Sequence, residues 1–198
     1  MHEALVFDYD GVIADTEPLH WRSWAALLSP YGIDLGWEDY CAFGRGVTDA
    51  QMYDLLKKHA PLPDADQFSR LNLERKRTVR EWSLARIPIL PATVAMLRTL
   101  DNRRVGLVTS SARVEAEPVL RAADIYDLFH SIVFGDDVGS PKPSPEPYSL
   151  IAQRLGIRSG IAFEDSAAGM ESARAAGFTA VRIERPEDLP LMVARFAS

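Results

Sequence analysis

The chain has 198 residues, of which 47% are hydrophobic and 25% charged, and its 22 Lys+Arg and 28 Asp+Glu give a formal net charge of −6. This composition is typical of a globular enzyme with one main domain, and it excludes a disordered chain, a collagen-like repeat and a disulfide scaffold. A single cysteine, and the absence of a basic and apolar leader before Asp8, predict a cytoplasmic protein without a membrane segment. The acidic charge balance argues against nucleic acid as a partner.

The first predicted element is a buried strand at residues 4–7, where a short apolar run leads directly into Asp8. The stretch from about residue 16 to 85 contains no convincing strand, and its apolar residues recur at helical intervals, which predicts a small helical bundle. We therefore expect a helical cap of residues 17–84, inserted into a core domain made of residues 1–16 and 85–198.

After the expected cap, predicted helices and strands alternate along the chain. The predicted helices are residues 93–100, 114–123, 145–155 and 167–176, and the predicted strands are residues 105–108, 132–134, 161–163 and 179–183. Such alternation is typical of a doubly wound parallel sheet, so the predicted fold class is α/β.

Carboxylates follow two of the predicted strands, and ligands of an open α/β sheet bind beyond the carboxyl ends of its strands. Asp8 and Asp10 follow the first strand, and Glu164 and Asp165 follow the strand at 161–163. Carboxylates this close repel one another unless a cation or a proton lies between them. A solvated loop would also explain the first pair, and helix capping would explain one member of the second.

Hydroxyl groups follow the predicted strand at 105–108, and one lysine follows the predicted strand at 132–134. Thr109 and Ser110 precede a predicted helix, where free backbone N–H groups form an anion site, although ordinary helix capping would explain a single hydroxyl. Lys142 lies between two prolines, which stiffen its backbone. Together the strand ends offer carboxylate oxygens to a hard cation such as Mg²⁺, and hydroxyl and amino groups to a phosphoryl group. One carboxylate could then attack phosphorus while another moves a proton.

Four motifs spread over nearly the whole chain resemble those of the haloacid dehalogenase superfamily of phosphotransferases. They are Asp-Tyr-Asp-Gly-Val at 8–12, Val-Thr-Ser at 108–110, Pro-Lys-Pro at 141–143 and Phe-Glu-Asp-Ser at 163–166. The insertion after the first motif is similar to the helical cap of the subgroup that contains phosphoglycolate phosphatases and β-phosphoglucomutase. The resemblance implies a Rossmann-like core.

The same resemblance implies a role for each motif residue. Asp8 would be the nucleophile that forms an aspartyl-phosphate, Asp10 the general acid and base, and Thr109 and Lys142 would neutralise the transferring phosphoryl group. The implied ligands of Mg²⁺ are Asp8, Asp165, the backbone carbonyl of Asp10, and Glu164 either directly or through water. Asp10 favours phosphate chemistry, because dehalogenases lack the second aspartate of the first motif.

The resemblance to β-phosphoglucomutase extends into the cap, where it implies substrate-binding roles for His20, Arg45 and Lys76. Arg45 belongs to a Gly-Arg-Gly-Val-Thr run at 44–48 that is similar to a substrate-specificity loop. The mutase pattern places an arginine directly after that loop, but this chain has Asp49, which puts mutase activity in doubt unless Arg45 substitutes.

Each substrate-binding residue also has a simpler interpretation. His20 could be an ordinary histidine on a helix face, and the basic run at 75–77 could be a solvated helix face. Ser110, which we also include as substrate-binding, could contribute only its backbone N–H.

The sequence therefore predicts a monomeric, Mg²⁺-dependent phosphatase that hydrolyses a small phosphorylated metabolite, similar to a sugar phosphate, through an aspartyl-phosphate. A phosphomutase of the β-phosphoglucomutase type is the alternative. A binding module that has kept the fold and lost turnover is a third interpretation, which the intact acid pairs oppose.

Overall fold

The computed structural model describes residues 4–45, 47, 49–58, 61–100 and 103–196. The chain forms two compact units, one made of Met1–Asp15 with Ile87–Ser198 and the other of Thr16–Arg86. None of the described helices has both the length and the apolarity needed to cross a membrane.

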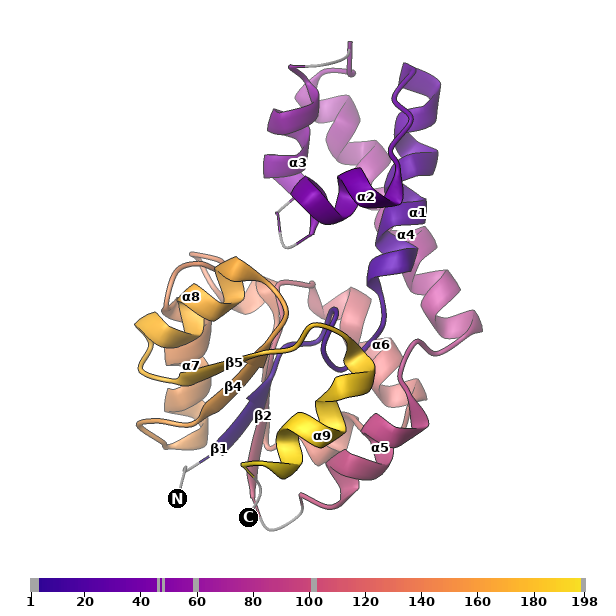
Figure 1. Ribbon diagram of the computed structural model, residues 1–198. Coiled ribbons are helices and arrows are strands. Elements are labelled where there is room, and N and C mark those ends of the chain that lie inside the picture. Colours follow the sequence, from indigo (N-terminus) through magenta and orange to yellow (C-terminus); the bar gives the residue numbers. More distant parts are fainter. Residues whose placement is uncertain (1–3, 46, 48, 59–60, 101–102, 197–198) are drawn as a thin grey trace. The chain divides into compact units, whose positions relative to one another are not determined.

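The first unit is built on a five-stranded parallel sheet with the strand order β3-β2-β1-β4-β5 (Figure 1). Its strands are β1 (Ala4–Phe7), β2 (Arg104–Val108), β3 (Ser131–Val133), β4 (Ile161–Glu164) and β5 (Thr179–Arg182). β1 is buried along its whole length, as its four apolar residues predict for the centre of a parallel sheet. The α/β class and the parallel sheet expected from the sequence are confirmed.

Helices cover both faces of this sheet, with α7 and α8 on one face and α5, α6 and α9 on the other (Figure 1). Their bounds are α5 (Pro91–Arg98), α6 (Arg113–Ala122), α7 (Glu146–Leu155), α8 (Ala167–Ala175) and α9 (Leu189–Ala194), with short 3₁₀ turns at η3 (Tyr126–Leu128), η4 (Gly135–Asp137) and η5 (Pro186–Asp188). Successive residues of β1 pack alternately, because Leu5 and Phe7 join the core under α6 whereas Val6 joins the core under α7.

One helix boundary differs from the expected one. α5 begins at Pro91 and ends at Arg98, whereas the sequence predicted a helix over residues 93–100. Pro91 occupies the first turn, where its missing N–H costs nothing and its fixed φ suits a helix. The proline therefore starts the helix and does not merely precede it.

The second unit is helical, and none of its described residues forms a strand. Its elements are α1 (Glu17–Leu28), η1 (Ser29–Tyr31), α2 (Trp37–Asp39), a π-helical turn η2 (Tyr40–Gly44), α3 (Asp49–Leu56) and α4 (Ala65–Ala85). α1 packs along α4, and the ring of Trp24 stacks on that of Phe68 at 6.0 Å. The expected helical insertion is thus confirmed.

Candidate active site

Three buried carboxylates meet at the carboxyl ends of the two neighbouring strands β1 and β4. Phe7 lies opposite Phe163 in the sheet, so the residues that follow them, Asp8 and Glu164, leave the sheet side by side. Asp8, Glu164 and Asp165 are only 6%, 0% and 5% exposed. Each offers a carboxylate oxygen, and these oxygens lie within 4.8 Å of one another. The sheet topology therefore brings two motifs 156 residues apart into one acidic cluster.

Lys142 lies inside this cluster. Its Nζ is 2.9 Å from Asp8 Oδ1, 2.6 Å from Glu164 Oε1 and 3.1 Å from the carbonyl oxygen of Val108. Glu164 Oε1 also accepts a hydrogen bond of 2.7 Å from the hydroxyl of Tyr148, a residue of α7. One buried ammonium group thus binds two buried carboxylates, which is the arrangement that makes burial of charge tolerable.

The buried charges shift one another's pKa. Burial raises the pKa of Asp8 well above its usual range, the charge of Glu164 raises it further, and the charge of Lys142 acts in the opposite direction. Burial alone would lower the pKa of Lys142, but the charges of Asp8 and Glu164 outweigh burial and the pKa is raised. Lys142 is therefore a permanent cation near pH 7, and Asp8 is a carboxyl that needs positive charge beside it to ionise.

Two glycines leave room for the second carboxylate pair. A Cβ at Gly11, whose φ is +74°, would lie 2.4 Å from Asp165 Oδ2, and a Cβ at Gly169 would lie 1.9 Å from Glu164 Oε2. That Glu164 oxygen is buried and has no hydrogen-bond partner among the described residues. Three convergent carboxylates, one with an oxygen that lacks a donor, fit a small divalent cation with hard oxygen ligands.

The side chain of Asp10 is held by hydroxyl groups that follow β2. Ser111 Oγ donates a hydrogen bond of 2.7 Å to Asp10 Oδ2, and Thr109 Oγ1 lies 3.5 Å from the same oxygen. The backbone N–H of Ser111 in turn donates to Thr109 Oγ1 over 2.9 Å. The first and second motifs are thereby joined, while Ser110, the neighbouring serine, is exposed.

The other residues expected to bind substrate lie in the helical unit of Thr16–Arg86. Arg45 Nε is 4.0 Å from Glu17 Oε1, and Lys76 Nζ is 2.9 Å from Asp49 Oδ2. His20 is a residue of α1. Of the expected specificity loop at 44–48, residues 46 and 48 lie outside the described residues. The substrate-binding roles of His20, Arg45 and Lys76 stay predictions.

Arg75 corrects one expectation, because it is buried and not part of a solvated helix face. Its guanidinium group lies 4.1 Å from the centre of the Trp24 ring and donates to Asp49 Oδ1 over 2.9 Å and to Ser23 Oγ over 3.1 Å. Burial alone would favour the neutral form of Asp49, but the charges of Arg75 and Lys76 outweigh it, and the pKa of Asp49 is lowered. Asp49, at the position where the mutase pattern has an arginine, thus forms ion pairs with both Arg75 and Lys76.

Sequence reasoning missed four residues that contact these groups, namely Ser111, Tyr148, Gly169 and Arg75. Ser111 belongs to the same hydroxyl run as Thr109, but the sequence does not show which serine turns toward Asp10. Tyr148 reads as one more apolar position of a helix. Gly169 donates its backbone N–H to the N-cap Ser166, three residues earlier, and this spacing indicates a helix N-terminus without revealing the carboxylate beside it.

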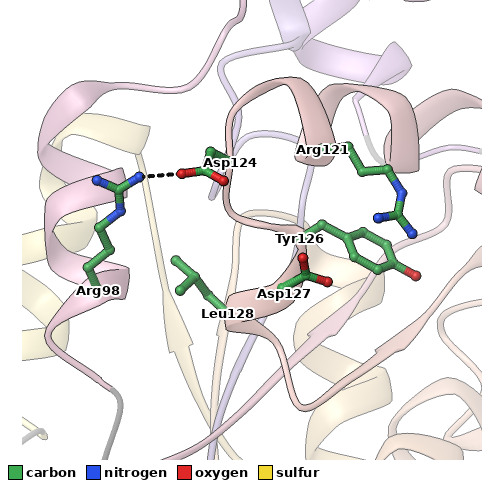
Figure 2. Close-up of a pocket in the computed structure, with 6 residues that line it drawn as sticks. All are labelled: Arg98, Arg121, Asp124, Tyr126, Asp127 and Leu128. Carbon is green, nitrogen blue, oxygen red and sulfur yellow. Dashed lines mark hydrogen bonds and ion pairs between the residues drawn. The ribbon is translucent and has the colours of Figure 1, made fainter.

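A separate hollow of about 370 Å³ lies around η3, which precedes the amino end of β3 (Figure 2). Arg98 pairs with Asp124 at 2.9 Å there, and the guanidinium group of Arg121 lies 3.8 Å from the centre of the Tyr126 ring. Its charges are exposed, in contrast to the buried charges at the carboxyl ends of β1 and β4. We therefore take the acidic cluster as the candidate active site.

Comparisons with known proteins bear on the family of the chain. The family model of haloacid dehalogenase-like hydrolases matches residues 5–183. The chain is 33% identical over 181 residues to a phosphorylated carbohydrates phosphatase of Thermotoga maritima, covering 88% of this chain and 82% of that protein. It is 29% identical over 184 residues to the fructose-1-phosphate phosphatase YqaB of Escherichia coli, covering 92% and 96%.

Among solved structures, a β-phosphoglucomutase from Clostridium difficile has the same fold, with a TM-score of 0.81, 23% identity, and coverage of 100% of this chain and 97% of that one. The resemblance drawn from the four sequence motifs is confirmed by these matches. The chain belongs to the family of haloacid dehalogenase-like hydrolases.

Proposed function

We propose that the protein is a Mg²⁺-dependent phosphatase that hydrolyses the phosphate ester of a small metabolite similar to a sugar phosphate, with Asp8 as the nucleophile. The observation that carries this proposal is the buried cluster of Asp8, Glu164 and Asp165 with Lys142 bound to two of its members. The substrate class is supported by relatives whose names give phosphorylated carbohydrates and fructose 1-phosphate as substrates.

The residues that would hold Mg²⁺ are Asp8, Asp165 and the backbone carbonyl of Asp10, with Glu164 bound directly or through water. When bound, the cation favours the ionised form of Asp8 and neutralises negative charge on the phosphoryl group. Lys142 binds Oδ1 of Asp8 and so fixes the orientation of the nucleophile. Thr109, together with Lys142, would bind phosphoryl oxygens.

The reaction has two steps, and the chain's own residues carry both. In the first, a carboxylate oxygen of Asp8 forms a bond to phosphorus, the bond between phosphorus and the ester oxygen breaks, and Asp10 gives its proton to the leaving oxygen. In the second, Asp10 takes a proton from a water molecule whose oxygen attacks phosphorus. This step breaks the bond to Asp8 and releases inorganic phosphate. Ser111 holds Oδ2 of Asp10 in the described structure.

His20 and Ser110 are proposed to bind substrate, and Arg45 and Lys76 are proposed to contact the part of it that does not react. Because such contacts select the substrate without entering the chemistry, their loss would act on kcat/KM for the physiological substrate and spare small aryl phosphates.

The test compares Asp8→Asn with the wild-type protein in Mg²⁺-dependent hydrolysis of p-nitrophenyl phosphate and a panel of sugar phosphates. Asp8→Asn keeps the shape and removes the nucleophile, so turnover should fall by several orders of magnitude. Beryllofluoride, a mimic of the acyl-phosphate, should be trapped by the wild-type protein and not by the variant, as measured by ¹⁹F NMR. Asp127→Asn is the matched control, because Asp127 is exposed in the same unit, and it should behave as wild type.

Two results would overturn the proposal. Wild-type protein that turns over none of these esters would be a binding module. Conversion of β-glucose 1-phosphate to the 6-phosphate, dependent on added bisphosphate and without release of inorganic phosphate, would identify a phosphomutase.

A further inference from the structure

Tyr148 is a fully buried tyrosine whose hydroxyl group points at the acidic cluster from α7. Its ring packs against that of Phe178, with 5.3 Å between the ring centres, and its hydroxyl donates to Glu164 Oε1 over 2.7 Å. A buried hydroxyl costs free energy unless it is hydrogen-bonded, and phenylalanine would fill nearly the same volume without that cost. The hydroxyl therefore has a specific task at Glu164.

The two oxygens of Glu164 have different surroundings. Oε1 accepts from both Tyr148 and Lys142, which approach from different elements of the fold. Oε2 lies against Gly169, where a Cβ would be only 1.9 Å away, and it has no hydrogen-bond partner among the described residues. Two donors on one oxygen fix the rotation of the carboxylate plane. The second oxygen is thereby held in place, buried and without a donor among the described residues.

We propose that Tyr148 is a positioning residue for the divalent cation, which acts by holding Glu164 through Oε1 so that Oε2 is presented to the cation site. This inference rests on the proposed function, because it takes Glu164 as part of that site. When a residue that hydrogen-bonds to a metal ligand is removed, the protein typically loses about 10–100-fold in metal affinity, because the ligand must then be ordered at the moment of binding.

The experiment measures the affinity of the protein for Mg²⁺ itself, by isothermal titration calorimetry without substrate. Tyr148→Phe removes only the hydroxyl and should raise the Kd for Mg²⁺ about tenfold or more. Tyr126→Phe is the matched control, since Tyr126 belongs to the same unit and lies in the hollow around η3. Its Kd should equal that of wild type. A Kd for Tyr148→Phe within twofold of wild type, in a protein with an unchanged circular dichroism spectrum, would overturn the proposal.

A double-mutant cycle separates positioning from a general loss of structure. In the background of Glu164→Gln, Tyr148→Phe should not weaken Mg²⁺ binding further, because the group that it positions has already changed. Equal and additive losses in the two backgrounds would show that the tyrosine acts elsewhere. If Tyr148→Phe does not fold, wild-type protein labelled with ¹³Cζ-tyrosine gives the answer: the Tyr148 resonance should shift on addition of Mg²⁺ and the Tyr126 resonance should not. An unmoved Tyr148 signal in protein that binds Mg²⁺ contradicts the proposal.

Steady-state kinetics of Tyr148→Phe test the same proposal. At saturating Mg²⁺ the kcat of Tyr148→Phe should stay within about threefold of wild type, while the Mg²⁺ concentration for half-maximal rate rises in parallel with the Kd. A loss in kcat alone would contradict the proposal. The failure of the proposed function is distinguishable, since it would appear as absence of turnover in the wild-type protein, whereas the Mg²⁺ titration needs no substrate.

Discussion

Replacing Lys142 by methionine should destabilise the protein more than any exposed ion pair can. The substitution keeps most of the apolar stem and removes the charge that lies 2.9 Å from Asp8 and 2.6 Å from Glu164. These carboxylate side chains are only 9% and 0% exposed, so water cannot take over the role of the ammonium group. Removing one partner of a buried ion pair costs roughly 3–5 kcal/mol, because the remaining charge stays buried without compensation.

Proton uptake sets an upper limit on this cost. A buried carboxyl can become neutral, and for Asp8, with an ordinary pKa of 3.8, protonation at pH 7 costs about 4 kcal/mol. In the folded state burial already raises this pKa, and the variant loses the Lys142 charge that lowers it. A carboxyl whose pKa is raised on folding contributes stability below its unfolded pKa and loses that contribution as the pH rises through the folded pKa. The deficit of Lys142→Met relative to wild type should therefore grow from pH 5 to pH 8.

Urea unfolding in EDTA at several pH values, followed by far-UV circular dichroism, measures this deficit. The control is Arg98→Met, because Arg98 lies 2.9 Å from Asp124 but the two side chains are 54% and 92% exposed. That exposed pair should contribute less than about 1 kcal/mol at every pH. Addition of Mg²⁺ should return part of the stability to Lys142→Met, since a cation that binds only the folded state stabilises it. A deficit no larger than that of the control, or one that is the same at pH 5 and pH 8, would refute the reasoning.

Two further predictions follow from the hydroxyl cluster and from the cap. Ser111→Ala removes the 2.7 Å hydrogen bond to Asp10, so kcat for alkyl phosphates should fall about tenfold. The kcat for p-nitrophenyl phosphate should fall less, because its leaving group needs little protonation. Equal losses for the two substrates would contradict the role of Asp10. Asp49→Asn should lower the free energy of unfolding by about 1–2 kcal/mol at pH 7, because the carboxylate that neutralises buried Arg75 is lost. The pKa of Asp49 is lowered because two cations outweigh burial, so this contribution is present above its unfolded pKa and disappears as the pH falls through the folded one. A difference in urea unfolding that does not shrink as the pH is lowered below the ordinary pKa of 3.8 would be evidence against it.

The acidic cluster was predictable because strand ends are easy to recognise in a sequence of this class. A short apolar run that stops at a carboxylate indicates both the strand and the place where it ends, and β1 and β4 are such runs. Once the two strands pair in parallel, Asp8 and Glu164 must emerge together, without any long-range information beyond the sheet order.

The partners of the cluster were not predictable, because their roles depend on the direction of single side chains. Ser110 and Ser111 are identical in type and adjacent, yet Ser110 is exposed and Ser111 donates to Asp10. The turn that follows β2 decides between them. Tyr148 fits the apolar spacing of α7 as well as phenylalanine would, so the pattern carries no signal for its hydroxyl. Periodicity reports which face of a helix is buried, and it is silent on polar atoms inside that face.

Arg75 shows that a run of charged residues likewise does not reveal which side chain is buried. A run of three basic residues is typical of a solvated helix face, but one of every three or four positions on a helix turns toward its neighbour. In α4 that position is Arg75, which stacks over Trp24 and reaches Asp49. Asn72, one turn earlier, accepts one of its hydrogen bonds, but the other two acceptors, Ser23 and Asp49, are far away in the sequence and cannot be read from local composition.

The ion pairs of the helical unit bear on the choice between phosphatase and mutase. A mutase must grip a second phosphate, and Arg45 and Lys76 are the cations that the sequence offers for it. Each lies beside a carboxylate of its own unit, Lys76 at 2.9 Å from Asp49 and Arg45 at 4.0 Å from Glu17. A second phosphate would have to displace or repel those carboxylates, at a cost that grows with its charge. A hydroxyl group would donate to them instead. If this unit binds the substrate as proposed, its ion pairs favour the uncharged, hydroxylated end of a substrate with one phosphate, in line with the proposed phosphatase.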